Sequence, residues 1–142
     1  MALKFPVHIP FVEQLGFELV AFGDGEAELR LDLTEAHLNS WAVAHGGVVM
    51  TLLDVSMAHA ARSHGRKEDG FGPGVVTIEM KTSFMNSARG PLVAIGHVLQ
   101  ATGRMAFTQA RIEDAEGRLC AHATGTFKYV PRKPSMSAPP TD

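Results

Sequence analysis

Hydrophobic and polar residues alternate along several stretches of this chain, a pattern typical of half-buried β-strands. The clearest alternation runs over 26–33 (EAELRLDL), and a Gly-Asp-Gly turn at 23–25 separates it from a strand-like run at 17–22 (FELVAF). Alternation on both sides of a glycine-rich turn predicts a β-hairpin. We expect a short helical turn over 10–15 and an irregular segment over 34–44.

A different pattern covers 46–63, where apolar residues fall on nearly every side of a helix. Such a distribution predicts a helix surrounded by protein rather than one lying on a surface. One sheet covers only one face of a helix, so we expect the remaining faces to meet a partner subunit. The composition of 62–74 predicts a loop after the helix.

Four further strand-like runs follow, at 75–85, 91–102, 105–114 and 119–130, with turn signals at Arg89-Gly90, Gly103-Arg104 and Glu116-Gly117. Two strands, one helix and then a run of antiparallel strands predict an α+β fold rather than a parallel βαβ fold. We expect one domain over 1–130. The Pro- and Ser-rich segment 131–142 predicts a disordered tail.

Composition narrows the class of protein. The 142 residues are 45% hydrophobic and carry a formal net charge of −2, so a sizeable core is expected and a nucleic-acid partner is not. No apolar run approaches the length of a membrane span, and Pro6 and Pro10 interrupt the N-terminal apolar residues, which argues against a signal peptide. A single cysteine fits a reducing compartment, and we expect a cytoplasmic protein.

The strongest chemical signal is His45-Gly46-Gly47 followed, within the predicted helix, by Asp54. An ionised carboxylate is costly to bury, which favours a functional role. Two glycines leave backbone N–H groups uncrowded at a helix start, where the dipole favours negative charge. An acid and an anion-stabilising turn on one element suggest carbonyl chemistry. The alternatives are a structural acid paired with a basic residue and glycines that only permit close packing.

Other reactive residues give weaker signals. Ser56 lacks the G-x-S-x-G context of a serine hydrolase, and Cys120 sits in an apolar strand typical of a small core residue. The remaining histidines have no metal-binding spacing, so no metal site is expected; they are His8, His37, His59, His64, His97 and His122.

The order of elements resembles the hotdog fold, one long central helix wrapped by a curved antiparallel sheet of five to six strands. Within it the chain resembles the PaaI-type acyl-CoA thioesterases. Asn39, His45-Gly46-Gly47, Asp54 and the segment 75–90 (VVTIEMKTSFMNSARG) support the resemblance, which covers roughly residues 10–130.

The resemblance implies hydrolysis of a coenzyme A thioester at a site between two subunits. Asp54 would be the general base or nucleophile, and the Gly46 N–H would polarise the thioester carbonyl. Asn39 would position the water or the thioester, and Thr77 would lie beside the carboxylate and hold the water. Substrate contacts are expected at His45, Gly47, Phe84, Met85, Asn86, Arg89, Gly103 and Arg104. Coenzyme A is part of the substrate, so no cofactor is expected.

Distance also favours a shared site. Gly46 and Asp54 are eight residues apart, about 12 Å along a helix axis, whereas one thioester carbon must lie roughly 3 Å from both the attacking oxygen and the oxyanion donors. Two antiparallel copies of the helix would set Asp54 of one beside Gly46 of the other. We expect a homodimer as the minimum unit, and the resemblance implies a homotetramer.

Two other functions remain open. A hotdog dehydratase or hydratase would pair a catalytic histidine with an acid, and His45 is the candidate. A non-catalytic acyl-CoA-binding module would use the same pocket without hydrolysis. Asp54 argues against the second function, because a pure binder has no reason to keep a buried carboxylate beside the acyl group.

Overall fold

The computed structural model describes residues 2–65 and 73–131. In order, its elements are α1 (Pro10–Leu15), β1 (Glu18–Gly23), β2 (Glu26–Asp32), the 3-10 helix η1 (Glu35–His37), α2 (Gly46–His64), β3 (Gly74–Phe84), β4 (Pro91–Ala101), β5 (Met105–Asp114) and β6 (Leu119–Val130). Every predicted helix and strand is present, with each boundary within one residue of its expected position. The predicted tail beyond residue 131 and residues 66–72 of the predicted loop lie outside the described residues.

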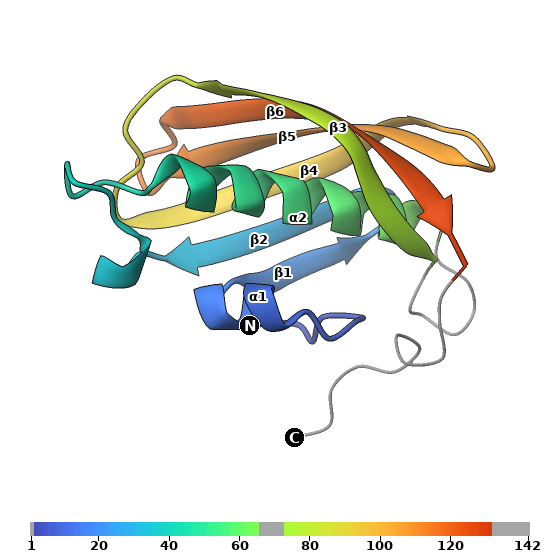
Figure 1. Cartoon of the computed structure of the whole chain (residues 1–142), viewed down its shortest axis with the longest axis horizontal. Coiled ribbons are helices and arrows are strands. Elements are labelled where there is room, and N and C mark those ends of the chain that lie inside the picture. Colours follow the sequence, from blue (N-terminus) through green and yellow to red (C-terminus); the bar gives the residue numbers. More distant parts are fainter. Residues whose placement is uncertain (1, 66–72, 132–142) are drawn as a thin grey trace.

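The described strands form one antiparallel sheet in the order β1-β2-β4-β5-β6-β3, and α2 lies across one of its faces (Figure 1). The α+β prediction is therefore confirmed, with a sheet of six strands. Consecutive strands are neighbours in the β1–β2 hairpin and from β4 to β6. The turn signal at Arg89-Gly90 marks a crossover rather than a tight turn, because β3 pairs with β6 at the far edge of the sheet.

Small residues on the inner face of the sheet let α2 approach closely. A Cβ atom at Gly96 of β4 would lie 2.6 Å from the backbone oxygen of Ser56, and one at Gly125 of β6 would lie 3.0 Å from the Met57 side chain. Buried alanines surround these glycines: Ala94, Ala106, Ala110, Ala121 and Ala123. The position of α2 on the sheet is thus fixed by close backbone contact.

One stripe of α2 faces away from the sheet. Gly47 and Met50 are exposed, and Thr51, Asp54 and Ala58 are half-buried, at the spacing of a single helix face. The expectation of protein on nearly every side of the helix is therefore not met within one chain. Burial on the sheet side explains the remaining apolar residues, and Asp54 belongs to the open stripe.

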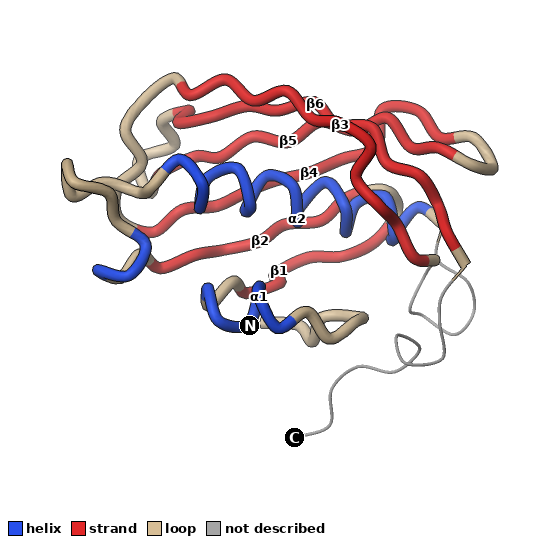
Figure 2. Tube along the Cα trace, in the orientation of Figure 1, coloured by secondary structure: helices blue, strands red, loops and turns tan. Residues whose placement is uncertain are grey.

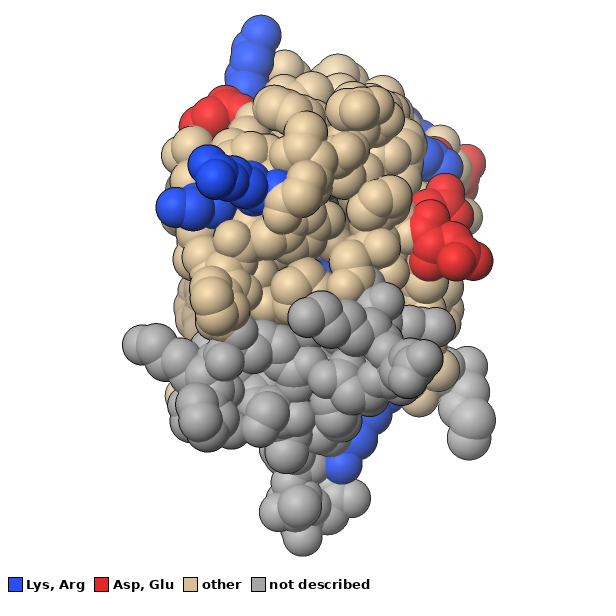
Figure 3. Space-filling model, turned by 90° about the vertical axis from the view of Figure 1, so that its right-hand side faces the viewer, with Lys and Arg blue, Asp and Glu red and all other residues tan. Residues whose placement is uncertain are grey.

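The described surface gives two further facts. No helix in residues 2–65 and 73–131 combines the length and apolar character that a membrane span requires. On the face shown in Figure 3, the Lys and Arg side chains and the Asp and Glu side chains that are drawn form small separate groups among uncharged residues.

His59 of α2 is a buried imidazole inside this core. It is 1% exposed, its Nδ1–H donates to the Val55 carbonyl at 2.8 Å, and its ring meets those of Phe5 and Phe22 edge-on. Burial, and then the positive charge of Arg62, lower the pKa of His59 from 6.5 to about 4, against a smaller opposing effect of the bond to Val55. The folded protein therefore holds His59 neutral.

We expect acid to destabilise the protein through this residue. Between pH 6.5 and 4 the unfolded chain binds a proton at His59 and the folded chain does not, so stability falls as pH decreases, by about 2 kcal/mol at pH 5. Urea unfolding of the wild type and His59→Leu at pH 7.5 and 5, at one protein concentration, measures this loss. His64→Gln, at an exposed position of the same helix, is the control. Equal acid sensitivity in His59→Leu and wild type would refute the assignment.

Candidate active site

The start of α2 is capped by the residue that precedes it. His45 has an extended backbone, and its Nδ1 accepts the Gly47 N–H at 2.8 Å. This bond leaves only one of the two expected amides open: within the described residues, the Gly46 N–H has no acceptor. The expectation that both glycines present free N–H groups is corrected to Gly46 alone, because the imidazole occupies the other amide.

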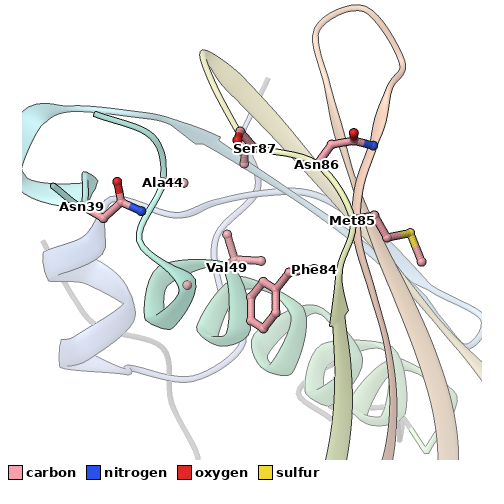
Figure 4. A pocket seen from close by; sticks show the side chains of 9 residues that line it. Asn39, Ala44, Val49, Phe84, Met85, Asn86 and Ser87 are labelled. Atoms are coloured by element: carbon pink, nitrogen blue, oxygen red, sulfur yellow. The ribbon is translucent and has the colours of Figure 1, made fainter. Parts of the chain in front are cut away.

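Asn39 belongs to a tight loop before the helix. Its Oδ1 accepts the Trp41 N–H at 2.8 Å, and its own N–H donates to the Val43 carbonyl at 2.8 Å. Ala42 closes the loop with a positive φ of 60°, an uncommon conformation for a non-glycine residue. Because the oxygen of the Asn39 side chain is held by the backbone, its Nδ2 is the end that is turned toward the cavity described next (Figure 4).

A cavity of about 330 Å³ lies at the N-terminal end of α2. Figure 2 shows that the loops before α2 and after β3 come to this end of the molecule. The cavity is lined by Asn39, Ala44, Gly46, Val49, Phe84, Met85, Asn86, Ser87 and Ala88. It brings together five residues predicted from the sequence, from segments up to 47 positions apart.

The side chains after β3 have different directions (Figure 4). The Phe84 ring lies against the start of α2, within 3.6 Å of where a Gly46 Cβ would be. Met85 points away from the helix, and Asn86 points toward a neighbouring hairpin, where its Nδ2 donates to the Leu119 carbonyl at 2.7 Å. Of these three, Phe84 is the side chain that approaches the helix start.

Asp54 lies two turns further along α2, beside β3. The Thr77 hydroxyl donates to Asp54 Oδ1 at 2.8 Å. Burial raises the pKa of the Asp54 carboxyl above its ordinary value, and the hydrogen bond from Thr77 opposes part of this increase. A half-buried carboxylate with one oxygen held and a raised pKa is suited to accept a proton or to attack an electrophile.

Within one chain, the Asp54 carboxylate and the cavity at the start of α2 lie apart. Asp54 and Thr77 are not among the residues that line the cavity. Eight helical residues separate Asp54 from Gly46, about 12 Å along the axis. One copy therefore has a cavity with an open amide at the helix start and a carboxylate on the open helix stripe, but does not bring both around one atom.

Five predicted contacts are not among the residues that line the cavity. His45 and Gly47 form the cap at the start of α2. Arg89 is exposed on the crossover segment. Gly103 and Arg104 are exposed in the β4–β5 turn, at the end of the sheet opposite the start of α2 (Figure 1). A single chain does not bring this turn to the candidate site.

Sequence reasoning missed four residues that line the cavity: Ala44, Val49, Ser87 and Ala88. Val49 could have been found from its position one turn after Gly46. Ser87 and Ala88 lie within the 75–90 segment on which the resemblance rests, but they gave no signal of their own, because they are ordinary loop residues whose place depends on the crossover after β3. The buried Cys120 lies in β6, and no group of three His, Cys, Asp or Glu within the described residues could hold a metal ion.

Comparisons with known proteins agree with this architecture. The family model of the thioesterase superfamily matches residues 42–121. The medium/long-chain acyl-CoA thioesterase YigI of Escherichia coli is 26% identical over 135 residues, with 87% of each chain covered. The structure of a conserved protein of Pseudomonas aeruginosa has a TM-score of 0.79 and 30% identity, covering 88% of this chain and 97% of its own.

The Escherichia coli PaaI protein from the phenylacetic acid degradation operon has a TM-score of 0.78, covering 87% of this chain and 86% of its own. At 19% identity this likeness shows the fold alone. The family match spans more than half of the chain and includes His45, the glycines of the helix start and Asp54. The chain has the hotdog fold and belongs to the thioesterase superfamily.

Proposed function

We propose that this protein hydrolyses an acyl-CoA thioester to a free acid and coenzyme A. The observation that supports the proposal most is the half-buried Asp54 carboxylate, held by Thr77 and open on the face of α2 that the sheet does not cover. The superfamily and the likeness to YigI favour acyl-CoA as the substrate class. Within the superfamily, the Asn39, His45-Gly46-Gly47 and Asp54 pattern is similar to the PaaI type.

The chemistry requires little more than these groups. Asp54 would attack the carbonyl carbon or take a proton from an attacking water. The Gly46 N–H, at the positive end of the helix dipole, and Asn39 Nδ2 would stabilise the developing oxyanion. The leaving thiolate of coenzyme A needs no strong general acid, because an ordinary thiol has a pKa near 8.5. No metal is needed for this route.

The proposal includes a homodimer, since one chain separates Asp54 from the cavity. The open stripe of α2 lies next to the edge strand β3 and is not covered by the sheet, so the two offer a surface for a second copy. A two-fold axis along this surface would place Asp54 of one copy near Gly46 of the other. A homotetramer and a cytoplasmic location remain part of the proposal.

The coenzyme A contacts are also proposals. His45 and Gly47 build the helix start, Phe84, Met85 and Asn86 line one edge of the cavity, and Arg89 lies outside it on the crossover segment. Gly103 and Arg104 would contribute only from another subunit. The role of His45 as a helix cap favours hydrolysis over the dehydratase reaction, because its Nδ1 is already engaged by Gly47.

The decisive experiment is thiol release from a panel of acyl-CoA esters, with medium and long aliphatic chains and aromatic acyl groups. Turnover of at least one ester supports the proposal. Tight binding of the esters without thiol release would identify a binding module instead. Hydration of an enoyl-CoA would identify the dehydratase and hydratase class.

Thr77 provides a prediction about pH. Its hydrogen bond stabilises the charged form of Asp54, so Thr77→Val is expected to raise the pKa of Asp54 and move the acidic limb of kcat/KM to higher pH. On that limb kcat/KM should fall at least about tenfold, the lower end of the range for one hydrogen bond to a charged group, with a smaller change on the plateau. Thr77→Ser keeps the hydroxyl and should restore the wild-type profile. If the acidic limb of kcat/KM in Thr77→Val lies at the same pH as in the wild type, the hydrogen bond from Thr77 does not lower the pKa of Asp54.

A further inference from the structure

One wall of the cavity has no regular secondary structure. Residues 85–88 continue from β3 toward the crossover, and neighbouring elements hold them in place. Toward α2, the Ala44 N–H donates to the Ala88 carbonyl at 2.9 Å. Toward β6, the N–H groups of Met85 and Asn86 donate to the Cys120 carbonyl at 2.8 and 3.1 Å. The shape of the wall therefore depends on the start of β6, which follows the β5–β6 turn.

Arg118 of that turn makes a further connection to the wall. Its Nη2 donates to the Ser87 carbonyl at 3.0 Å, and its Nε donates to Asp114 Oδ2 at 3.2 Å. The Asp114 side chain is only 10% exposed, and its Oδ1 accepts the N–H groups of Glu116 and Arg118. These bonds hold the pKa of the Asp114 carboxyl below its usual value. A fixed carboxylate thus orients the guanidinium toward Ser87.

The second contact to the Ser87 carbonyl is weaker, since the Cys120 Sγ lies 3.9 Å away. Arg118 is therefore its principal donor. The Arg118 side chain is itself 49% exposed, so its ion pair contributes little to global stability. Its main effect is geometric. The planar guanidinium group hydrogen-bonds the Asp114 carboxylate and the Ser87 carbonyl at the same time, which the single ammonium group of a lysine cannot do in the same geometry.

We propose that Arg118 is a positioning residue for substrate binding. By joining Asp114 to the Ser87 carbonyl, it keeps residues 85–88 in the shape that forms the cavity wall. It acts through the wall and does not touch the reacting atoms. Its predicted effect on KM rests on the proposed function, whereas its effect on the wall does not.

The first test is hydrogen–deuterium exchange of the whole protein. Arg118→Ala should speed exchange in a peptide that spans 85–88 and leave the peptides of α2 unchanged. The matched control is Arg111→Ala: Arg111 Nε donates to Glu113 at 3.0 Å, its side chain is 41% exposed, and neither residue contacts the wall. Unchanged exchange over 85–88, or an equal increase in both variants, would overturn the proposal.

The second test is kinetic. Arg118→Ala should raise KM about fivefold and change kcat less than about twofold. Asp114→Asn should have a similar effect, and the double variant should be no worse than either single one, because all three break one connection. Arg118→Lys should not restore KM. An unchanged KM in Arg118→Ala, or fully additive effects, would refute the role in substrate binding.

Direct contact of Arg118 with a coenzyme A phosphate is distinguished by a short substrate. An acyl-N-acetylcysteamine thioester has no phosphate, so a positioning role predicts the same relative rise in KM as for the acyl-CoA. A rise confined to the acyl-CoA would overturn the positioning role. If the wild type hydrolyses neither thioester, the proposed function fails, and the exchange experiment still decides whether Arg118 holds the wall.

Discussion

The substitution Asp54→Asn is expected to lower kcat for acyl-CoA hydrolysis by at least about 10²-fold. Asparagine keeps the size of the side chain, and its Oδ1 can still accept the Thr77 hydroxyl, which lies 2.8 Å from Asp54 Oδ1. It has no negative charge, so it can neither attack the carbonyl carbon nor take a proton from water. Thiol release from the best ester of the panel measures the loss.

Glu79→Gln is the matched control for Asp54→Asn. Its carboxylate also accepts a threonine hydroxyl, from Thr126 at 2.7 Å, and it lies on β3 close to Thr77 but outside the proposed site. We expect kcat of Glu79→Gln within about twofold of wild type. A kcat of Asp54→Asn within about tenfold of wild type would rule out Asp54 as base or nucleophile.

The two roles open to Asp54 differ in the origin of an oxygen atom. Single-turnover hydrolysis in water enriched in heavy oxygen labels the product acid if water attacks the thioester directly. If Asp54 attacks first, it forms a mixed anhydride and expels the coenzyme A thiolate. When water then opens this anhydride at the Asp54 carboxyl carbon, the oxygen that enters the first product comes from the Asp54 carboxylate and is unlabelled. The side chain keeps the label instead, where mass spectrometry of the protein can find it.

Local sequence patterns were sufficient to predict the helices and strands, but not to predict which strands pair with each other. Alternation and glycine turns predicted β2, β5 and β6 because these signals depend on residues close together in the chain. The pairing of β3 with β6 joins Thr77 to Phe127, fifty residues later, and no short-range signal encodes it. The open stripe of α2 was hidden for a related reason: Gly47, Met50 and Ala58 look apolar in sequence whichever surface they meet.

The candidate site could likewise be predicted from the sequence only in part. The spacing of Gly46 and Asp54 on one helix made their separation calculable from sequence, because helix geometry is regular. The contact between Thr77 and Asp54 crosses 23 positions and followed from the resemblance, not from the local pattern. The capture of the Gly47 N–H by His45 depends on a side-chain rotamer, and the contact of Arg118 with Ser87 depends on tertiary packing, so neither had a signal in the sequence.

Replacing Gly46 by proline is expected to lower kcat about 10²–10³-fold, the usual effect of losing one oxyanion donor. Proline removes the N–H but suits the first position of a helix. The preceding residue must then be extended, and His45 already has φ −61° and ψ 139°. Gly46→Ala is the control: its Cβ would meet Phe84 at an ordinary 3.6 Å and the N–H remains, so kcat should stay close to wild type. Equal losses in the two variants would point to packing, not to the amide.

The same variant tests whether the site is shared between two copies. If Asp54 of one chain works with Gly46 of the other, a heterodimer of Asp54→Ala and Gly46→Pro contains one site with both defects and one with neither. Random mixing of the two inactive proteins, after dissociation and reassembly, should then restore about a quarter of wild-type activity, because about half of the dimers are mixed and each has one intact site. If each chain used its own Asp54 and Gly46, every site would keep a defect. Mixed dimers without activity would therefore refute the shared site and leave the 12 Å separation within one helix unexplained.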